Sequence, residues 1–254
     1  MSGRPRILAV ANRKGGTAKT TTAVNVAAEW AAGRRVLLVD LDPQGHATLG
    51  AGAHPAPDHP GLRALLGAQP PALDPLLVPA AEPGVWVLPP GDPLAGPPAG
   101  TDPGAAASWL RREAARLGFE RVVIDTPPDA GAALKLGLLA ADHVVVPFVP
   151  HPLAAEGVRQ MARLFYRIAT RANAGLRLAG LVPVMLDRRL REHRRVVAEL
   201  AGRFGAARLL RGVRASIRVA ESLGRGLAVR RHAPRSGGAL DYALLAGEIE
   251  LAMG

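Results

Sequence analysis

Two of the three lysines in this 254-residue chain lie in one short glycine-containing loop near the N-terminus. The loop residues are Lys14, Gly15, Gly16, Thr17, Ala18, Lys19, Thr20 and Thr21. Backbone N–H groups ahead of a helix favour an anion, and glycines allow a phosphate to approach the backbone closely. A lysine at the end of such a loop can reach the β- and γ-phosphates of a nucleotide, and the next hydroxyl can bind Mg²⁺. We therefore predict a phosphate-binding loop in which Lys19 and Thr20 take these roles.

The loop departs from the common phosphate-loop pattern GxxxxGK[ST] at two positions. Arg13 stands where the pattern has its first glycine, and Ala18 stands where it has its last. A glycine turn with incidental lysines is the alternative interpretation. A predicted strand before the loop, a predicted helix after it and acidic residues at two later strand ends all favour the phosphate loop.

Acidic residues come at the ends of two further predicted strands, RVLLVD and RVVID. Asp40 ends the first of these strands and Asp42 follows it, whereas Asp125 ends the second. Because parallel strands end at the same edge of a sheet, these carboxylates should converge on the phosphate loop. Mg²⁺ takes few protein ligands beside phosphate and water, so we predict a magnesium site formed by Thr20, Asp125 and Asp40. One carboxylate could instead hold the attacking water, and capping of a helix is the alternative for Asp42.

Strands and helices alternate along the chain, as a doubly wound sheet requires. Apolar runs predict strands at 6–11, 35–40, 84–89, 121–125, 144–149 and 178–186. Helical spacing predicts helices at 20–32, 105–117, 134–140, 154–171, 192–204 and 240–253, with a helical turn or two at 62–67. We expect α/β architecture with one mostly parallel, twisted sheet and helices on both faces, in a single domain over 1–254.

One segment, 51–104, holds 14 of the 23 prolines and cannot form a long helix. We predict a proline-rich connection there that stays attached to the sheet through the strand-like sequence VWVL. A disordered linker between two domains is the alternative.

Positive charge is concentrated in the second part of the chain. Residues 151–254 carry 19 arginines and 8 acidic residues, which accounts for the whole net charge of +11. The arginine guanidinium can form two hydrogen bonds to one phosphate, so a polyanionic partner such as DNA is indicated. A codon bias towards arginine explains the choice of residue but not its location.

The absence of cysteine excludes disulfides, thiolate zinc sites and iron–sulfur clusters. The sequence has no run of eighteen or more apolar residues, and its first apolar stretch is too short for a signal peptide. We therefore expect a soluble, cytoplasmic protein without a membrane partner.

Several motifs together resemble the ParA/Soj family of partition ATPases, within the deviant Walker A group that also includes MinD and the nitrogenase iron protein. The loop and second strand, NRKGGTAKTTTAVNVAAEWAAGRRVLLVDLDPQGHAT, are similar to the family's loop, second strand and first switch. VVIDTPP is similar to its Walker B strand, and VVVPFVPHPLAAEGVRQM and RVAESLGRGLAV resemble its later landmarks. The resemblance spans nearly the whole chain.

The resemblance implies roles for single residues. Lys14 would be the signature lysine, which reaches the nucleotide of the other subunit in a homodimer with ATP sandwiched between the subunits. Lys19 and the two threonines after it would hold phosphates and Mg²⁺. Asp42 would be the switch carboxylate needed for hydrolysis, Asp125 the Walker B acid, and Asp40 a supporting group.

The resemblance also implies DNA binding without sequence preference, with Arg189 and Arg218 at the matching positions. The full set that we predict to contact DNA is Arg188, Arg189, Arg194, Arg195, Arg211, Arg214 and Arg218. A ParB-type centromere-binding protein would then trigger hydrolysis and release from the nucleoid. A solvated helix face is the alternative for 188–195, and it is our expectation for Arg159, Arg163 and Arg167.

Other functions stay open at this point. The chain could position a protein cargo, or it could be a DNA-binding regulator that does not hydrolyse ATP, because Ala18 places a methyl group where the family has glycine. A MinD-like membrane ATPase should end in a basic amphipathic helix, whereas this chain ends in LAGEIELAMG. The resemblance, rather than any residue, implies adenine as the base.

Overall fold

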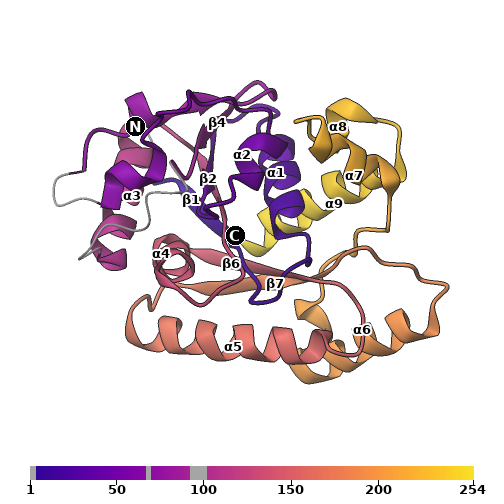
Figure 1. Ribbon diagram of the computed structural model, residues 1–254. Helices are drawn as coiled ribbons and strands as arrows, with labels where there is room; N and C mark the ends of the chain where they lie inside the picture. The colour runs from indigo at the N-terminus through magenta and orange to yellow at the C-terminus, as the bar shows by residue number, and fades with distance from the viewer. Residues whose placement is uncertain (1–3, 67–69, 92–101) are drawn as a thin grey trace.

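The computed structural model describes residues 4–66, 70–91 and 102–254, which form a twisted sheet flanked by helices (Figure 1). Within these residues the sheet has seven strands in the order β3-β4-β2-β5-β1-β6-β7. The strands are β1 (Arg6–Val10), β2 (Val36–Asp40), β3 (Val78–Pro79), β4 (Val85–Leu88), β5 (Arg121–Asp125), β6 (His143–Phe148) and β7 (Arg177–Pro183). The short β3 pairs antiparallel with β4, and the other neighbouring pairs are parallel. The predicted fold class is confirmed.

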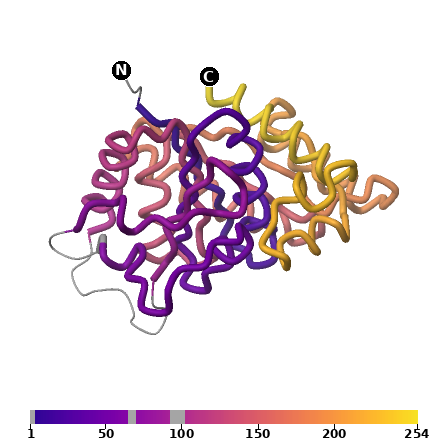
Figure 2. Tube along the Cα trace, turned by 90° about the horizontal axis from the view of Figure 1, so that it is seen from above, coloured from indigo at the N-terminus to yellow at the C-terminus, as the bar shows by residue number. Residues whose placement is uncertain are grey.

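Helices connect the strands and cover the sheet. The α-helices are α1 (Lys19–Trp30), α2 (His46–Gly50), α3 (Pro103–Arg116), α4 (Ala132–Ala140), α5 (Ala154–Arg171), α6 (Arg191–Phe204), α7 (Ile217–Gly224), α8 (Val229–His232) and α9 (Gly237–Ala252). Short 3₁₀ helices are η1 (Gly61–Leu66), η2 (Asp74–Leu76) and η4 (Ala206–Arg208). Seen from above, the C-terminal helices lie on one side of the molecule and α3 lies on the other (Figure 2).

Two apolar cores sandwich the sheet because successive side chains of a strand point to opposite faces. On β1, Ile7 and Ala9 pack into a core shared with α3, α4, α5 and α6. Leu8 and Val10 of the same strand pack into a second core with α1 and α9. All four side chains are fully buried. Burial on both faces explains why the strands read as continuous apolar runs rather than alternating ones.

The predicted long elements match the structure within a few residues, and α5 matches its predicted bounds of 154–171. The elements that the sequence did not reveal are short: β3, α2, α7, α8, η2 and η4. Segments of two to eight residues carry too little periodicity to stand out from turns. Of these, α2 lies closest to the predicted site, because its Thr48 donates to Asp40 at the end of β2.

The described part of the proline-rich connection is bound to the sheet. Its strand β4 pairs with β2, with Val36 opposite Val85. Leu62, Leu73 and Leu76 are buried in the core that contains α3. Residues 67–69 and 92–101, and with them the end of the predicted turn at 62–67, lie outside the described residues.

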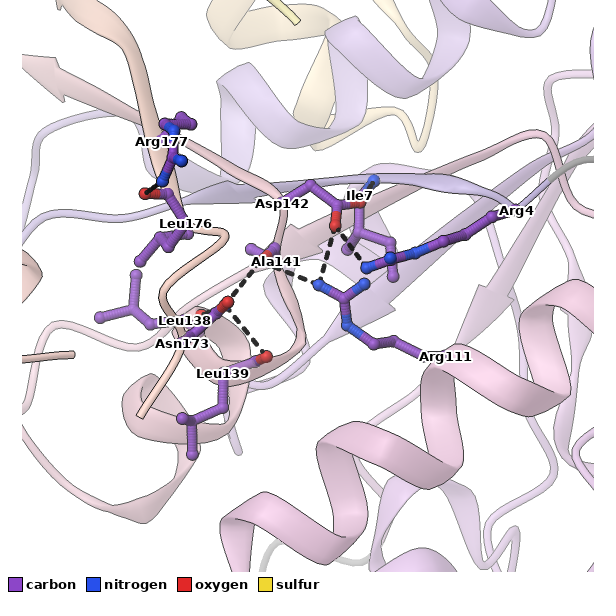
Figure 3. Close-up of polar contacts among 10 residues, drawn as sticks. All are labelled: Arg4, Ile7, Arg111, Leu138, Leu139, Ala141, Asp142, Asn173, Leu176 and Arg177. Carbon is purple, nitrogen blue, oxygen red and sulfur yellow. Dashed lines mark hydrogen bonds and ion pairs between the residues drawn. The ribbon is translucent and has the colours of Figure 1, made fainter. Parts of the chain in front are cut away.

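A polar network ties the strands together at the edge where they begin, which we call the amino edge (Figure 3). The carboxylate of Asp142, just before β6, accepts hydrogen bonds from Arg4 (3.0 Å), from Arg111 on α3 (2.9 Å) and from the backbone N–H of Ile7 (3.0 Å). Asn173 donates to three carbonyls at the end of α4, the shortest at 2.8 Å. Both oxygens of Asp142 therefore have partners at this edge.

Candidate functional site

The predicted phosphate loop leaves β1 and enters α1 at the opposite, carboxyl edge of the sheet. Asn12 is buried and fixes the start of the loop, since its amide donates to the carbonyl of Pro147 on β6 at 2.8 Å. The side-chain oxygen of Asn12 accepts from the backbone N–H of Lys14 at 3.1 Å. Thr17 closes the turn by donating to the carbonyl of Lys14 at 3.2 Å. The loop is thus held between two strands before any ligand binds.

The tip of the loop is open. Gly15 and Gly16 are exposed, and a Cβ built on either would meet no other atom of the described residues within 4 Å. Gly16 has φ +69°, a conformation that favours glycine. The space above these two residues is therefore free for a group that approaches the backbone closely.

Lys19 lies across the loop rather than in solvent. Its side chain is buried, and its ammonium group donates to the carbonyl of Lys14 at 3.1 Å. Burial lowers the pKa of Lys19, whereas the nearby charges of Asp125 and Asp42 oppose that shift. A buried cation beside an open backbone cradle is suited to an anionic phosphate.

Thr20 and Asp125 meet at the end of β5. The Thr20 hydroxyl donates to Oδ2 of Asp125 at 2.7 Å. Asp125 is fully buried, and within the described residues its Oδ1 has no hydrogen-bond partner. Burial, followed by the charge of Asp40, raises the pKa of Asp125 well above its usual range. A hydroxyl and an unpartnered carboxylate oxygen beside the phosphate loop fit the oxygen ligands that Mg²⁺ takes together with phosphate and water.

Asp40 pairs with Asp125 in the strand register but faces different partners. One of its oxygens accepts both from the N–H and from the hydroxyl of Thr48, each at 2.8 Å, and the other accepts from the N–H of Asp42 at 3.2 Å. Burial raises the pKa of Asp40 to about 6. Of the two acids predicted as metal ligands, Asp125 has the unpartnered oxygen, whereas Asp40 holds the loop after β2 in place.

Asp42 occupies that loop, and its side chain is half-buried. Its Oδ1 accepts from the N–H of Gln44 at 3.0 Å, and its carbonyl accepts from Gly45, which has φ +66°. This turn leads into α2. The structure therefore brings Asp42, Asp125, Thr20 and Lys19 to the same edge of the sheet.

Lys14 contacts a residue that the sequence did not single out. Its ammonium group lies against Nε2 of His151, in the segment after β6, and Nδ1 of that ring accepts from the N–H of Leu153 at 3.1 Å. Burial and the charge of Lys14 lower the pKa of His151, which favours the neutral form of the ring. The position of His151 just beyond a parallel strand was the signal available in the sequence.

Ala18 and Arg13, the two departures from the loop pattern, have distinct consequences. Ala18 precedes α1 with φ 54°, a left-handed conformation that is strained for a residue with a Cβ. Arg13 is half-buried, and its Nε has no partner within the described residues. Neither departure closes the loop, because the space above the two glycines is open.

All seven arginines predicted to contact DNA are exposed. Five of them also form ion pairs: Arg189 with Asp187, Arg195 with Glu192, Arg211 with Glu248, Arg214 with Asp241 and Arg218 with Glu221. The guanidinium of Arg194 donates to the carbonyl of Arg188 at 2.9 Å. Much of the positive charge in this region is therefore balanced locally.

A parallel sheet with a phosphate loop after its first strand and acids at neighbouring strand ends defines the class of P-loop nucleotide-binding proteins. Residues 8–229 match the CobQ/CobB/MinD/ParA nucleotide-binding domain family. Together with the Soj and ParA relatives described next, this match shows that the chain belongs to the ParA/Soj family of the ParA/MinD superfamily, a family of nucleotide-binding ATPases.

Individual relatives span nearly the whole chain. The chromosome-partitioning ATPase Soj of Thermus thermophilus is 37% identical, covering 96% of this chain and 95% of that protein. The chromosome partitioning protein ParA of Caulobacter vibrioides is 33% identical, with coverage of 98% and 96%. A crystal structure of cobyrinic acid a,c-diamide synthase from Mycobacterium smegmatis with a bound ATP analogue and magnesium is 34% identical, with a TM-score of 0.77 over 96% of this chain and 93% of that one.

None of the helices in the described part of the chain has the length and apolar character needed to cross a membrane. The C-terminal helix α9 packs against α1, and its residues Tyr242, Leu245 and Ile249 are buried in the core. This helix is part of the fold rather than a separate amphipathic tail.

Proposed function

We propose that this protein is a DNA-partitioning ATPase that dimerises on ATP, binds DNA without sequence preference and is released when a ParB-type partner stimulates hydrolysis. The observation that carries the proposal is the prepared loop, with Lys19 folded over it and the Thr20–Asp125 pair beside it. The names of the relatives, chromosome-partitioning ATPase and chromosome partitioning protein, support the biological role.

In this proposal the loop backbone and Lys19 bind the phosphates of ATP, with Thr21 as a further phosphate-binding hydroxyl. Thr20 and Asp125 would hold Mg²⁺, with Asp40 in support. The metal would neutralise charge on the phosphates. Asp42 would orient the attacking water, because hydrolysis of a phosphate anhydride depends chiefly on positioning and charge.

Lys14 would act across the interface of the homodimer. In the single chain it contacts His151, so it must leave that residue to reach the nucleotide of the partner subunit. The neutral ring of His151 does not hold an ammonium group as a carboxylate would, which makes the release of Lys14 easier. We infer that this contact holds the signature lysine away from the nucleotide of the partner subunit between cycles of ATP hydrolysis.

DNA binding would use the exposed arginines of 188–218, which contact phosphates rather than bases and therefore carry no sequence preference. The net charge of +11, which originates in the second part of the chain, supports this assignment. Such binding would place the dimer on the nucleoid, in contact with a plasmid or chromosome cargo.

The decisive experiment measures DNA binding with ATP, with ADP and without nucleotide, each with and without Mg²⁺. We expect retention on DNA with Mg-ATP alone. Arg189→Glu and Arg218→Glu should abolish that retention and leave ATP-driven dimerisation intact. As a matched control, Arg112→Glu changes an exposed arginine on α3 and should leave DNA retention unchanged.

Three outcomes would redirect the proposal. DNA binding with ATP but no turnover, even with partner protein, would indicate a regulator that does not hydrolyse ATP. Turnover that responds to a protein cargo rather than to a DNA-bound partner would indicate a protein positioner. Nucleotide-dependent binding to anionic vesicles in place of DNA would indicate a MinD-like role.

A further inference from the structure

Helix α5 carries a row of arginines that the proposed function does not use. Arg159, Arg163, Arg167 and Arg171 recur at every fourth residue, and all four are exposed. At a rise of about 1.5 Å per residue the row is about 18 Å long. We call these four residues the α5 ridge.

A smaller share of the ridge is balanced by acids than of the seven arginines at 188–218, of which five form ion pairs. Arg159 pairs with Glu156 at the start of the helix. Along the chain as far as the structure describes it, Arg163, Arg167 and Arg171 have no acidic partner. From Gly157 to Leu186 the sequence contains five arginines and no acidic residue.

In the neighbouring helix α6, acidic residues one turn away form ion pairs with some of the arginines. There Arg195 pairs with Glu192 and Glu199, and Arg203 also pairs with Glu199. Like charges four residues apart repel one another, so a row of arginines without acids destabilises its helix. In the described residues, acids balance two of the four arginines of α6, Arg195 and Arg203, but only one of the four in the α5 ridge, Arg159.

We propose that the α5 ridge is a second surface for the DNA backbone, in addition to the arginines at 188–218. Phosphates along one strand of a duplex recur every 3.4 Å or so of helix axis, so a row about 18 Å long can contact several of them. Tyr166, a residue that is 68% exposed, lies among these arginines and adds a phenolic hydroxyl that can donate to phosphate.

The placement of α5 puts the α5 ridge on a helix that neighbours α6, which carries some of the arginines at 188–218. The helix begins beyond the carboxyl end of β6 and runs back to the amino edge, because it connects two parallel strands. It lies beside α6 along one flank of the molecule (Figure 1). The ridge therefore runs from the carboxyl edge towards the amino edge on a helix next to α6.

DNA suits this ridge better than an anionic membrane does. A helix that binds at a membrane surface inserts apolar side chains. The apolar side chains Val158, Met161 and Leu164 of α5 are instead buried against the sheet. The exposed side chains of the ridge are the arginines and Tyr166, which can contact phosphates without regard to sequence.

The test compares Arg163→Gln/Arg167→Gln with the wild type for binding to a DNA duplex in Mg-ATP, between about 50 and 200 mM salt. Each phosphate contact contributes about 0.9 to the slope of log K against log salt, so the slope should fall by about 2 for each subunit on the DNA. Arg163→Lys/Arg167→Lys should retain the slope, because the effect depends on charge. Arg34→Gln/Arg112→Gln removes the same charge on other elements and should bind as the wild type does.

This inference rests on the proposed function, and the outcomes separate the two. Wild type that does not bind DNA in Mg-ATP would overturn both. A different result would overturn the ridge alone. In that case the wild type binds DNA, Arg189→Glu abolishes binding, and Arg163→Gln/Arg167→Gln keeps the wild-type salt slope. The ridge would equally be lost as a DNA surface if its glutamine variant kept DNA binding but no longer bound phosphatidylserine vesicles. Unchanged ATP-driven dimerisation of the glutamine variant will show that it is folded.

Discussion

The two edges of the sheet differ in how completely their aspartate carboxylates are hydrogen-bonded. At the amino edge, Asp142 receives two arginines and a backbone N–H, so both of its oxygens are satisfied. At the carboxyl edge, Asp125 is fully buried with one oxygen unpartnered in the described part of the chain, and the charge of Asp40 lies beside it. The hydrogen bonds of the amino edge stabilise the fold, whereas the carboxyl edge holds polar groups that a ligand could contact.

This difference separates positions that maintain the fold from positions that serve a ligand. A buried carboxylate without partners destabilises a protein, so it persists where something else makes use of it. The open glycines and the buried Lys19 lie at the same edge as Asp125. The same substitution, aspartate to asparagine, should therefore have opposite effects on stability at the two edges.

The largest expected effect is on catalysis at the carboxyl edge. Asp42→Ala should lower ATP turnover on the order of a hundredfold, because an unpositioned water attacks slowly. The variant should accumulate as an ATP-bound dimer, seen by phosphate release together with size-exclusion chromatography. Asp142→Asn, at the amino edge, should keep the wild-type kcat. A normal turnover rate in Asp42→Ala would assign the water to another group.

Next in size is the loss of stability at the amino edge. Asp142→Asn should lower the free energy of unfolding by about 2 kcal/mol, since it weakens charged hydrogen bonds from two arginines. Urea unfolding measures this change. Arg4→Gln is a useful control, because Arg4 is 73% exposed and its pair with Asp142 should contribute less. An Asp142→Asn variant as stable as the wild type would refute the contrast between the edges.

A smaller change of opposite sign is expected for Asp125→Asn. Since the folded-state pKa of Asp125 is raised, its ionisation makes the wild type less stable as the pH rises above the usual aspartate value. The variant should be more stable than the wild type by about 1 kcal/mol at pH 8, with the gap closing towards pH 4. Urea unfolding at the two pH values checks the sign.

Bound nucleotide should make the wild type more stable than Asp125→Asn. Mg-ADP should stabilise the wild type against urea and have little effect on Asp125→Asn, because a ligand stabilises only the form that binds it. Equal stabilisation of both proteins by Mg-ADP would remove Asp125 from the metal site.

The smallest expected effect concerns the strained residue before α1. Ala18→Gly relieves a left-handed alanine but adds freedom to the unfolded chain, so the net gain in unfolding free energy should be about 0.5 kcal/mol. Ala243→Gly, on the exposed face of α9, should instead lose about 1 kcal/mol. Thermal unfolding of both variants distinguishes relief of strain from a general effect of glycine. A destabilised Ala18→Gly would contradict the argument.

Much of the fold followed from patterns that extend over many residues. Helix α5 was predicted with its observed bounds because its apolar spacing is regular over five turns. The short α2 was missed, although its Thr48 supplies two of the three donors to Asp40. Contacts such as Lys14–His151 and Arg214–Asp241 join residues that lie far apart in the chain, and no local pattern encodes them.

The sequence by itself determined which chemistry was available: two lysines and two glycines between a strand and a helix, acids at strand ends, and arginines in the second half of the chain. Only the tertiary structure decided which of these groups are already occupied. Asp40 and Asp125 end neighbouring strands in the same register, yet the first is bonded to Thr48 and the second keeps an unpartnered oxygen among the described residues. The reason is physical, since hydrogen bonding and charge balance depend on neighbours that folding brings together from distant parts of the chain.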